Sequence, residues 1–371
     1  MSNTLLTPSV IAKEALLVLE NNLVLGAFVH RDYSNEFAKV GNTIKIRKPA
    51  TFVANVWDGA NLNIQSITEA NVSVVMNTVL DVSFNISALE LTQNIVAFSE
   101  QIIQPAMRAH AQKIDELLAG LYVDVPYAVA VSSTANVADI ANARKKLNQN
   151  KVPMENRCGV LEPQSEAKYL VLDAFLHAEK RGDTEAVKNG SMGRVLGIDW
   201  YMDQNMRTHD AGTTDLAGVL NGAQAKASTS VVVNGLGTGN VTQGTLLTIA
   251  NCVGVYCVKD TAAITTGTNT NEATLNIAPA LEADAADAAV VTLIQGKRNL
   301  VFHKNAFALV TRPLEKSFGA GYSAVENYKG ISARVTAGYT MASKADTMSL
   351  DILLGIKTLT PELAVQLYDA N

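Results

Sequence analysis

The hydrophobic pattern of the chain is clearest between residues 72 and 86, where nearly every even position is apolar and the odd positions are mostly polar. This alternation predicts a β-strand with one buried face. Its length would be roughly 46 Å at about 3.3 Å per residue, against an ordinary strand of about 5–6 residues. A compact chain of 371 residues has a radius of gyration near ~21 Å. We therefore expect the strand to cross most of the subunit and to end on a neighbouring one. The apolar even positions are Val72, Val74, Met76, Leu80, Val82, Phe84 and Ile86, and Thr78 is the exception.

The beginning of the chain predicts an amphipathic helix. Thr7 is a suitable N-cap, Pro8 fits the first helical position, and the pattern stops at Asn21-Asn22. The apolar face of this helix either packs on the core of its own chain or contacts a neighbouring subunit, and Ile11 and Leu19 are the candidates for such a contact. The residues at helical spacing are Ile11, Ala15, Val18 and Leu19.

A short strand is expected over residues 41–48, where Ile44 and Ile46 alternate with polar residues. It is followed by a stretch from Pro49 to Ala70 that is apolar, has no clear secondary structure and contains a turn signal at Asp58-Gly59. An isolated two-stranded ribbon is marginal in water, and an apolar tip has to be covered. We therefore expect a long two-stranded arm that docks on another copy of the chain. The apolar residues of the stretch are Phe52, Val53, Val56, Trp57, Leu62, Ile64 and Ile67.

Four of these residues, Phe52, Trp57, Leu62 and Ile64, are the candidates for contacts between subunits. Arg47 and Lys48 stand where the arm begins, and they are candidates for ion pairs with acidic residues of a neighbour. The alternative interpretation is that both basic side chains belong to a solvated strand face.

A helical region is expected from Ser87 to Leu121, with a short piece at 88–92 that leads to a long helix. About 24 residues at 1.5 Å each make ~36 Å. Pro105 lies inside the long helix and is expected to break its hydrogen-bond ladder locally. His110 falls on the apolar stripe, and we interpret it as a packed residue that is not a ligand.

The middle of the chain alternates helices and strands. The pattern predicts a helix over 135–147 that ends in Arg144-Lys145-Lys146, and these basic residues suit a helix C-terminus better than a nucleic-acid patch. A strand is expected over 158–161 and another over 195–202. Between them, a helix is expected from a Ser165 cap to about Lys180, closed by Gly182.

The composition changes at residue 223. Residues 223–296 contain only seven charged side chains and are rich in Thr, Val, Gly and Ala, which predicts a small inserted all-β domain. A buried strand is expected over 300–310, and a hairpin over 331–339 and 348–356. Thr360-Pro361 is expected to cap a final short helix. The seven charged residues are Lys226, Lys259, Asp260, Glu272, Glu282, Asp284 and Asp287.

Composition narrows the class of protein. The chain is 48% hydrophobic and 18% charged, which provides for a core and argues against disorder. Its net charge of −5 argues against a dedicated nucleic-acid binder. No export signal is apparent, and the apolar stretch 16–29 is interrupted by polar residues, so we expect no membrane span. The three cysteines are expected as free thiols in a reducing cytoplasm; they are Cys158, Cys252 and Cys257.

No constellation of catalytic residues is found, and we expect neither an enzyme nor a cofactor. Gly235, Gly237 and Gly239 form a GxGxG without a following helix, which indicates a turn between strands. Cys252 and Cys257 lack a second pair of ligands for zinc. On an extended strand they would face opposite sides, which disfavours a local disulfide. The five histidines have no metal-ligand spacing; they are His30, His110, His177, His209 and His303.

The order of elements resembles that of tailed-bacteriophage major capsid proteins of the Hong Kong 97-type fold. Several strings are similar to the coat proteins of short-tailed phages that infect Salmonella. The strings are TPSVIAKEA at 7–15, GNTIKIRKP at 41–49, NLVFHKNAFALVTRP at 299–313 and KTLTPELA at 357–364.

This resemblance implies an α+β capsid fold divided into an N-terminal arm, an extended loop, a spine helix of about 95–121, and peripheral and axial domains. The implied divisions are 1–40 for the arm, 41–86 for the extended loop and its strands, 87–134 for the spine helix and part of the peripheral domain, 135–222 for the first part of the axial domain, 223–296 for the inserted β-domain, 297–324 for the return of the axial domain, and 325–371 for the peripheral hairpin and a C-terminal helix.

The resemblance also implies partners. The subunits would form hexamers and pentamers of an icosahedral head, with a scaffolding protein, a portal and enclosed double-stranded DNA that is bound without sequence specificity. A decoration protein is compatible with this arrangement. The virion would be the final location, and assembly would take place in the host bacterial cytoplasm. Two alternatives stay open: a bacterial nanocompartment shell with the same fold, and an enzyme with an unrecognised site.

Overall fold

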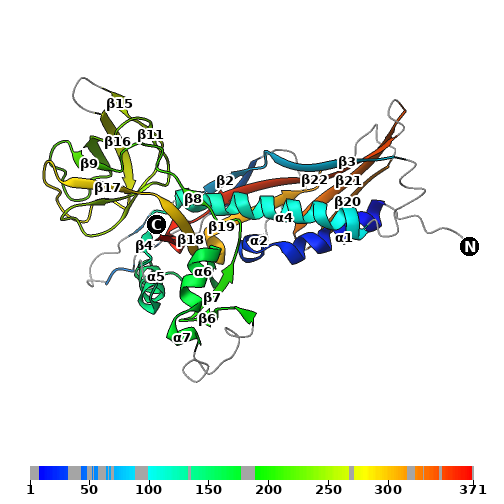
Figure 1. The fold of residues 1–371 in the computed structure, drawn as a ribbon, viewed down its shortest axis with the longest axis horizontal. Helices are drawn as coiled ribbons and strands as arrows, with labels where there is room; N and C mark the ends of the chain where they lie inside the picture. The colour runs from blue at the N-terminus through cyan, green and yellow to red at the C-terminus, as the bar shows by residue number, and fades with distance from the viewer. Residues whose placement is uncertain are drawn as a thin grey trace, which may run out of the picture. The chain divides into compact units, whose positions relative to one another are not determined.

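The computed structural model describes most of the chain in two compact units (Figure 1). The first unit comprises Met1–Leu19, Arg31–His110 and Leu309–Leu359, and the second comprises Glu20–His30, Ala111–Ala308 and Thr360–Asn371. The described residues are 8–31, 43–47, 52, 54–56, 64–65, 67, 71–87, 99–132, 135–176, 189–266, 271–315, 322–328, 330–341 and 345–369.

The expected N-terminal helix is present as α1, Pro8–Asn22, and is followed by the short helix α2, Leu25–Phe28. The proposed cap Thr7 lies outside the described residues. Ile11 and Leu19 are both buried by the chain itself, at 4% and 0% exposure. This corrects their choice as contact residues, because the helix buries its apolar face within its own subunit. Among the described side chains of this helix, Leu17 is a large apolar one that stays exposed, at 49%.

Long antiparallel strands form the sheet of the first unit, in the order β19-β22-β21-β20, with β3 also paired to β22 (Figure 1). The expected C-terminal hairpin is confirmed as β21 and β22, and part of its turn, 342–344, lies outside the described residues. The bounds are β3 Thr78–Ser87, β19 Phe307–Arg312, β20 Tyr322–Tyr328, β21 Ile331–Thr340 and β22 Ala345–Thr358.

The single long strand expected over 72–86 is wrong in one respect, because it is two strands. β2, Asn71–Val75, pairs with β1, Thr43–Arg47, whereas β3 pairs with β22. The ladder breaks at Met76 and Asn77, where the segment changes partners. The alternation itself is confirmed, since Val74, Met76 and Leu80 are buried and the odd positions are exposed.

The spine helix is confirmed as α4, Gln104–Ala119, and it continues into the 3₁₀ turn η3, Gly120–Asp124. A π-helical turn, η2 at Ser99–Ile103, comes directly before it. Pro105 thus stands in the first turn of α4, where its missing N–H is tolerated, and the regular ladder is broken just ahead of it. The expected short helix at 88–92 lies outside the described residues.

His110 on this helix is a packed residue, as expected. Its imidazole is buried, and Nε2 lies 3.0 Å from the carbonyl oxygen of Leu350. Burial lowers the pKa of His110, so the ring is held in its neutral form.

The second unit contains a mixed sheet in the order β4-β23-β18-β5-β7-β6, with β8 paired to β18. Helices α5 and α6 cover it, and side chains from both helices share one apolar core with β5, β7, β18 and β23 (Figure 1). The strand bounds are β4 Ala128–Ala130, β5 Arg157–Leu161, β6 Gly193–Val195, β7 Ile198–Met202, β8 Thr208–His209, β18 Gly296–His303 and β23 Ala364–Asp369. The helix bounds are α5 Val137–Gln149, α6 Pro163–Leu170 and α7 Asp173–Leu176.

The helix expected from Ser165 to Lys180 is corrected at both ends. Its N-cap is Glu162, whose side chain accepts the N–H of Ser165, with Pro163 at the first helical position. It stops at Leu170, and a turn brings Phe175 of α7 into the core. The closing residues 177–188, Gly182 included, lie outside the described residues.

Three further expectations are corrected in this unit. The strand over 195–202 is the hairpin β6–β7, because Leu196 and Gly197 have positive φ angles of 51° and 77°, as a two-residue type I′ turn requires. The strand over 300–310 is interrupted by the 3₁₀ turn η4, Lys304–Ala306, where His303 Nδ1 accepts the N–H of Asn305. The final helix is the single turn η5, Pro361–Leu363, and the chain continues as β23 in the mixed sheet.

A β-rich region follows β8, with its own apolar core that runs from Ala211 to Leu293. Its sheet has the order β10-β9-β17-β12-β13-β16-β15, beside the small pair β11–β14. Strand β9 belongs to this sheet, so the region begins before residue 223. The bounds are β9 Ala217–Leu220, β10 Ser230–Asn234, β11 Asn240–Val241, β12 Leu246–Ile249, β13 Tyr256–Val258, β14 Ala262–Ala263, β15 Thr265–Thr266, β16 Asn271–Ala278 and β17 Val290–Ile294.

The GxGxG segment is a turn between β10 and β11, as expected, and all three glycines have positive φ. Gly237 is the tightest position, because a Cβ there would lie 2.1 Å from Thr214 Oγ1. The cysteines Cys158, Cys252 and Cys257 are free and buried, in agreement with the expected thiols.

Within the second unit, one buried carboxylate holds the turn that follows α1. The N–H of Val24 donates to Asp115 Oδ2 and the N–H of Gly26 donates to Asp115 Oδ1, each at 2.8 Å. Asp115 belongs to α4 and is 1% exposed. It therefore fixes the path of residues 24–26 on the spine helix.

We expect Asp115→Ala to lower the free energy of unfolding by about 2–5 kcal/mol, because two backbone N–H groups lose a charged acceptor in a buried place. The matched control is Glu116→Ala. Glu116 is the next residue and makes only surface ion pairs with Lys113 and Arg207, so its loss should cost about 1 kcal/mol or less. Urea unfolding followed by circular dichroism measures both values, and equal losses would contradict the role of Asp115.

Candidate assembly surface

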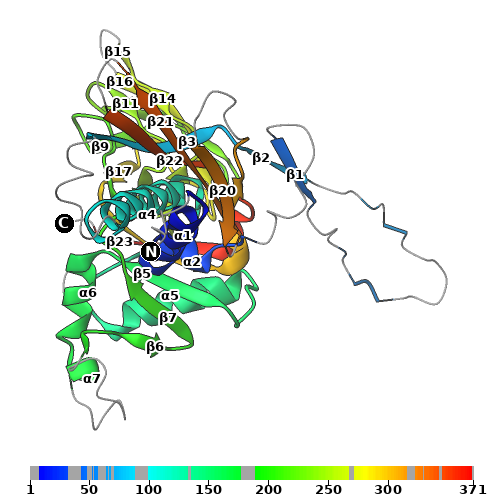
Figure 2. The ribbon, with the colours of Figure 1, turned by 90° about the vertical axis from the view of Figure 1, so that its right-hand side faces the viewer.

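The arm begins as a regular antiparallel ribbon. β1 and β2 pair so that Ile44 lies opposite Val74 and Ile46 opposite Val72 (Figure 2). Ile44, Ile46 and Val74 are buried, while Thr43 and Lys45 are exposed. The ribbon thus has one apolar face that is covered and one polar face that is open to water, as the alternating sequence predicts.

The base of the ribbon rests on the long hairpin of the same unit, where β2 contacts β22. The approach is closest at Gly355 of β22. A Cβ on this residue would lie 2.8 Å from the carbonyl oxygen of Val75 and 3.2 Å from a methyl carbon of Val74. Only glycine lets the two backbones come this close, so Gly355 anchors the ribbon to the sheet.

Beyond the ribbon, every large apolar side chain that the structure describes between residues 52 and 67 is exposed. Phe52 is 61% exposed, Val56 98%, Ile64 88% and Ile67 70%. All four belong to one segment of the arm, and apolar side chains that a chain leaves uncovered in this way are typical of interaction sites.

The structure thus places two of the candidate residues, Phe52 and Ile64, on this uncovered segment. Arg47 is the last residue of β1, opposite Asn71, but its side chain is outside the described set. Lys48, Trp57, Leu62 and the turn signal at Asp58-Gly59 also lie outside the described residues. Val56 and Ile67 are exposed as well, and the sequence pattern had included them among the apolar residues of the stretch without choosing them as contacts.

The first unit also carries a groove between α1 and β20. It has a volume of about 530 Å³ and a partly apolar floor formed by Leu16, Leu17 and Tyr328. Lys13, Glu14 and Glu326 give the rim its charges. Sequence analysis missed this groove, because it joins residues some 310 positions apart; the one local signal is Leu17, which is apolar but off the buried stripe of the helix.

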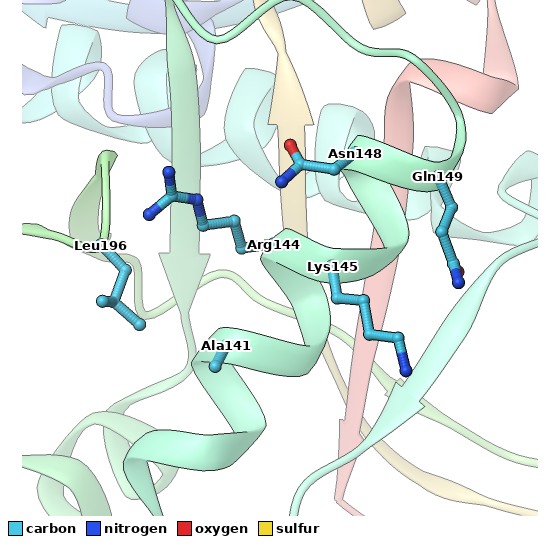
Figure 3. Close-up of a pocket in the computed structure, with 6 residues that line it drawn as sticks. All are labelled: Ala141, Arg144, Lys145, Asn148, Gln149 and Leu196. Carbon is cyan, nitrogen blue, oxygen red and sulfur yellow. The ribbon is translucent and has the colours of Figure 1, made fainter.

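A shallow depression on the second unit, about 490 Å³ in volume, is lined by basic and amide side chains of α5 and by Leu196. Figure 3 shows Arg144 on the side of the helix nearer Leu196, while Lys145 and Gln149 point the other way. The two cationic groups diverge, so they do not form one anion site. This arrangement agrees with the expected solvated face.

The structure gives no catalytic arrangement among the described residues. His303 is buried, and its pKa is lowered by burial and by the guanidinium of Arg157. Burial raises the pKa of Cys158 to about 11, so this thiol is a poor nucleophile at neutral pH. In the described part of the chain, no group of three or more His, Cys, Asp and Glu side chains has the geometry of a metal site. No described helix is both long and apolar enough to cross a membrane.

Comparison with solved structures identifies the fold. A structure of Mycobacterium phage Che8 is similar over 93% of this chain and 90% of that chain, with a TM-score of 0.54 at 16% sequence identity. The capsid of cyanophage P-SCSP1u is similar over 90% and 84%, with a TM-score of 0.48 at 14% identity. The mixed helices and sheets of the chain therefore have the Hong Kong 97-type fold of tailed-phage capsid proteins.

The family follows from the sequence itself. A comparison with curated protein sequences finds no match. A family model described as "P22 coat protein - gene protein 5" matches residues 2–259. The chain therefore belongs to the P22 coat protein family, and it is a phage major capsid protein, as the resemblance of its sequence strings implied.

We expect Gly355→Ala to lower the free energy of unfolding by about 1–3 kcal/mol, because its Cβ would press on the backbone of β2. The ribbon should also become more accessible to proteases. Gly338→Ala is the matched control, since Gly338 lies in the neighbouring strand β21 and a Cβ there meets no atom within 4 Å. Thermal unfolding and limited proteolysis of both variants test this, and two equally stable variants would show that the contact does not hold the ribbon.

Proposed function

We propose that this coat protein builds its shell by placing the exposed tip of its arm on another copy of the chain. One observation carries the proposal: Phe52, Val56, Ile64 and Ile67 are all exposed in the single subunit. Apolar side chains gain about 25 cal/mol for each Å² removed from water. A second copy is the partner that every subunit of a homopolymeric shell meets.

The groove between α1 and β20 is the surface that we propose for the receiving copy. Leu17 and Tyr328 offer an apolar floor. The carboxylates of Glu14 and Glu326 lie on its rim and outweigh the single ammonium group of Lys13 there. Arg47 and Lys48 at the base of the arm have the opposite charge. This complementarity supports the ion pairs that the sequence suggested for these two residues.

Assembly on this plan calls for large repeated interfaces. Obligate contacts bury about 2,000–5,000 Å² or more, and a projecting arm increases the area by overlap. We infer that the subunits form hexamers and pentamers of an icosahedral head that encloses double-stranded DNA. A net charge of −5 suits a shell whose wall does not bind the enclosed DNA tightly.

The same proposal includes further partners of the shell. A scaffolding protein and a portal would take part in assembly in the host cytoplasm, and a decoration protein could be added to the finished shell. The role is structural, with no enzymatic step. The β-rich region, from about residue 211 to 294, is the proposed insertion into the capsid fold, and its separate apolar core supports this division. Membership of the coat protein family disfavours the nanocompartment alternative.

The double variant Phe52→Asp/Ile64→Asp should remain folded and fail to assemble, because two charges would have to enter an apolar contact. Val171→Asp is the control, since Val171 is an exposed apolar residue of the second unit, 66% exposed, and is not part of the arm. Circular dichroism tests the fold, and sedimentation with negative-stain microscopy tests the shells. Normal shells from the double variant would refute the proposed contact.

Deletion of residues 52–67 should likewise leave a folded, monomeric subunit, since the large apolar side chains that the structure describes in this segment are mostly exposed in their own chain. Charge reversal, Arg47→Glu with Lys48→Glu, tests the ion pairs separately. It should reduce the yield of shells, and Glu14→Lys with Glu326→Lys in the same chain should restore part of it. Unchanged yield after the reversal would reject the ion pairs and leave the apolar contact standing.

A further inference from the structure

The β-rich region meets the mixed sheet of the second unit at a small buried junction. Leu246 and Cys257 of the β-rich region form an apolar cluster with Tyr368 of β23. The backbones are close here, since a Cβ on Gly244 would lie 2.9 Å from the Cα of Val123 in η3. The junction is thus tightly packed, but its apolar core is only a few residues wide.

A charged side chain with few hydrogen-bond partners lies at this junction. Arg298 of β18 is 0% exposed, and it is among the largest fully buried side chains of the subunit. Its Nη2 donates to the carbonyl oxygen of Ile294 at 2.7 Å, and the guanidinium lies 5.7 Å from the ring centre of Tyr368. Neither Nε nor Nη1 has a hydrogen-bond partner in the described part of the chain.

Among the described residues, the ionisable groups that act on the Arg298 guanidinium are neutral at pH 7, and none of them is a carboxylate. They are Tyr122 of η3, His209 of β8, Cys257 of β13 and Tyr368 of β23. Burial lowers the pKa of Arg298 to about 10, so it still carries its charge at neutral pH. A buried ion without a counter-ion destabilises the state that buries it.

A histidine joins the same junction from a neighbouring strand. His209 of β8 is buried, with Nδ1 2.7 Å from Tyr122 Oη and Nε2 2.8 Å from Thr245 Oγ1, next to β12. The charged groups that act on it are Arg298 of β18 and the adjacent Asp210. A proton on this ring would place a second positive charge beside Arg298.

We propose that this junction is a weak hinge, at which the β-rich region separates from the mixed sheet by local opening, driven by hydration of Arg298 and favoured by acid through His209. The inference concerns the single subunit and stands independently of how the arm docks. Opening exposes a small apolar area and allows water to reach two unsatisfied guanidinium nitrogens. The large apolar core of the β-rich region stays intact.

The direction of the pH effect follows from His209. Burial and the charge of Arg298 lower its pKa from 6.5 to about 4. In the open state, the exposed ring regains its ordinary pKa and binds a proton below pH 6.5. The closed state is therefore most stable above pH 6.5 and loses stability as the pH falls toward 4. Between pH 7 and 5 the opening constant should rise about twentyfold.

The first test is Arg298→Met in the full-length chain, with Arg207→Met as the control. Arg207 lies near the same strand but is half exposed and pairs with Glu116 at the surface. Hydrogen–deuterium exchange should slow at least about tenfold at the junction amides of 244–246 and 256–258 in the Arg298 variant, which corresponds to about 1.4 kcal/mol. The control should leave these rates unchanged. Unchanged or faster exchange in Arg298→Met would overturn the proposal, and so would a failure of this variant to fold.

The second test separates the acid effect. In the wild-type chain, exchange at the same amides, corrected for intrinsic rates, should rise about twentyfold from pH 7 to 5. In His209→Gln, which retains a hydrogen-bonding side chain but cannot bind the proton, the corrected rates should stay flat over this range. An equal rise in both proteins would overturn the role of His209 in the hinge.

Discussion

The apolar tip of the arm is the constraint on which the organisation of this subunit depends. Phe52, Val56, Ile64 and Ile67 lie beyond a two-stranded ribbon that is covered at its base. Two strands alone do not form a sheet that is large enough to bury apolar side chains. The chain is folded with these side chains uncovered, and in the proposed assembly another copy of the chain covers them.

Several local features prepare the subunit for such a contact. Gly355 allows β2 to lie close to β22, so the base of the ribbon packs against the long sheet of the first unit. Ile11 and Leu19 hold α1 against its own chain and leave Leu17 exposed beside Tyr328 at the groove. In the second unit, Asp115 fixes the turn after α1 on the spine helix. The subunit thus packs these elements internally and leaves one apolar segment exposed, which is the segment proposed to contact a neighbour.

Much of this organisation could be predicted from the sequence, because period-two and helical patterns report which face of an element is buried. The alternation of residues 72–86 gave the correct inward and outward side chains, although the strand breaks at Met76 and Asn77. That pattern does not indicate which strands pair. The change of partner, from β1 beside β2 to β22 beside β3, was therefore missed. Likewise, Leu196 and Gly197 form a type I′ turn that requires a positive φ at a leucine, and the side-chain pattern alone does not indicate it. The exposed apolar residues of the arm could be chosen from the sequence because they share one segment, whereas the groove and the Arg298 junction join distant segments and could not.

The most direct measurement of the central claim is a cryo-electron microscopy map of the assembled shell in which side chains of residues 52–67 are visible. The account predicts that Phe52 and Ile64 are buried against another copy of the chain, with Leu17 and Tyr328 of that copy among their contacts. A map in which these side chains are covered by their own subunit, or remain exposed to solvent in the finished shell, would contradict it.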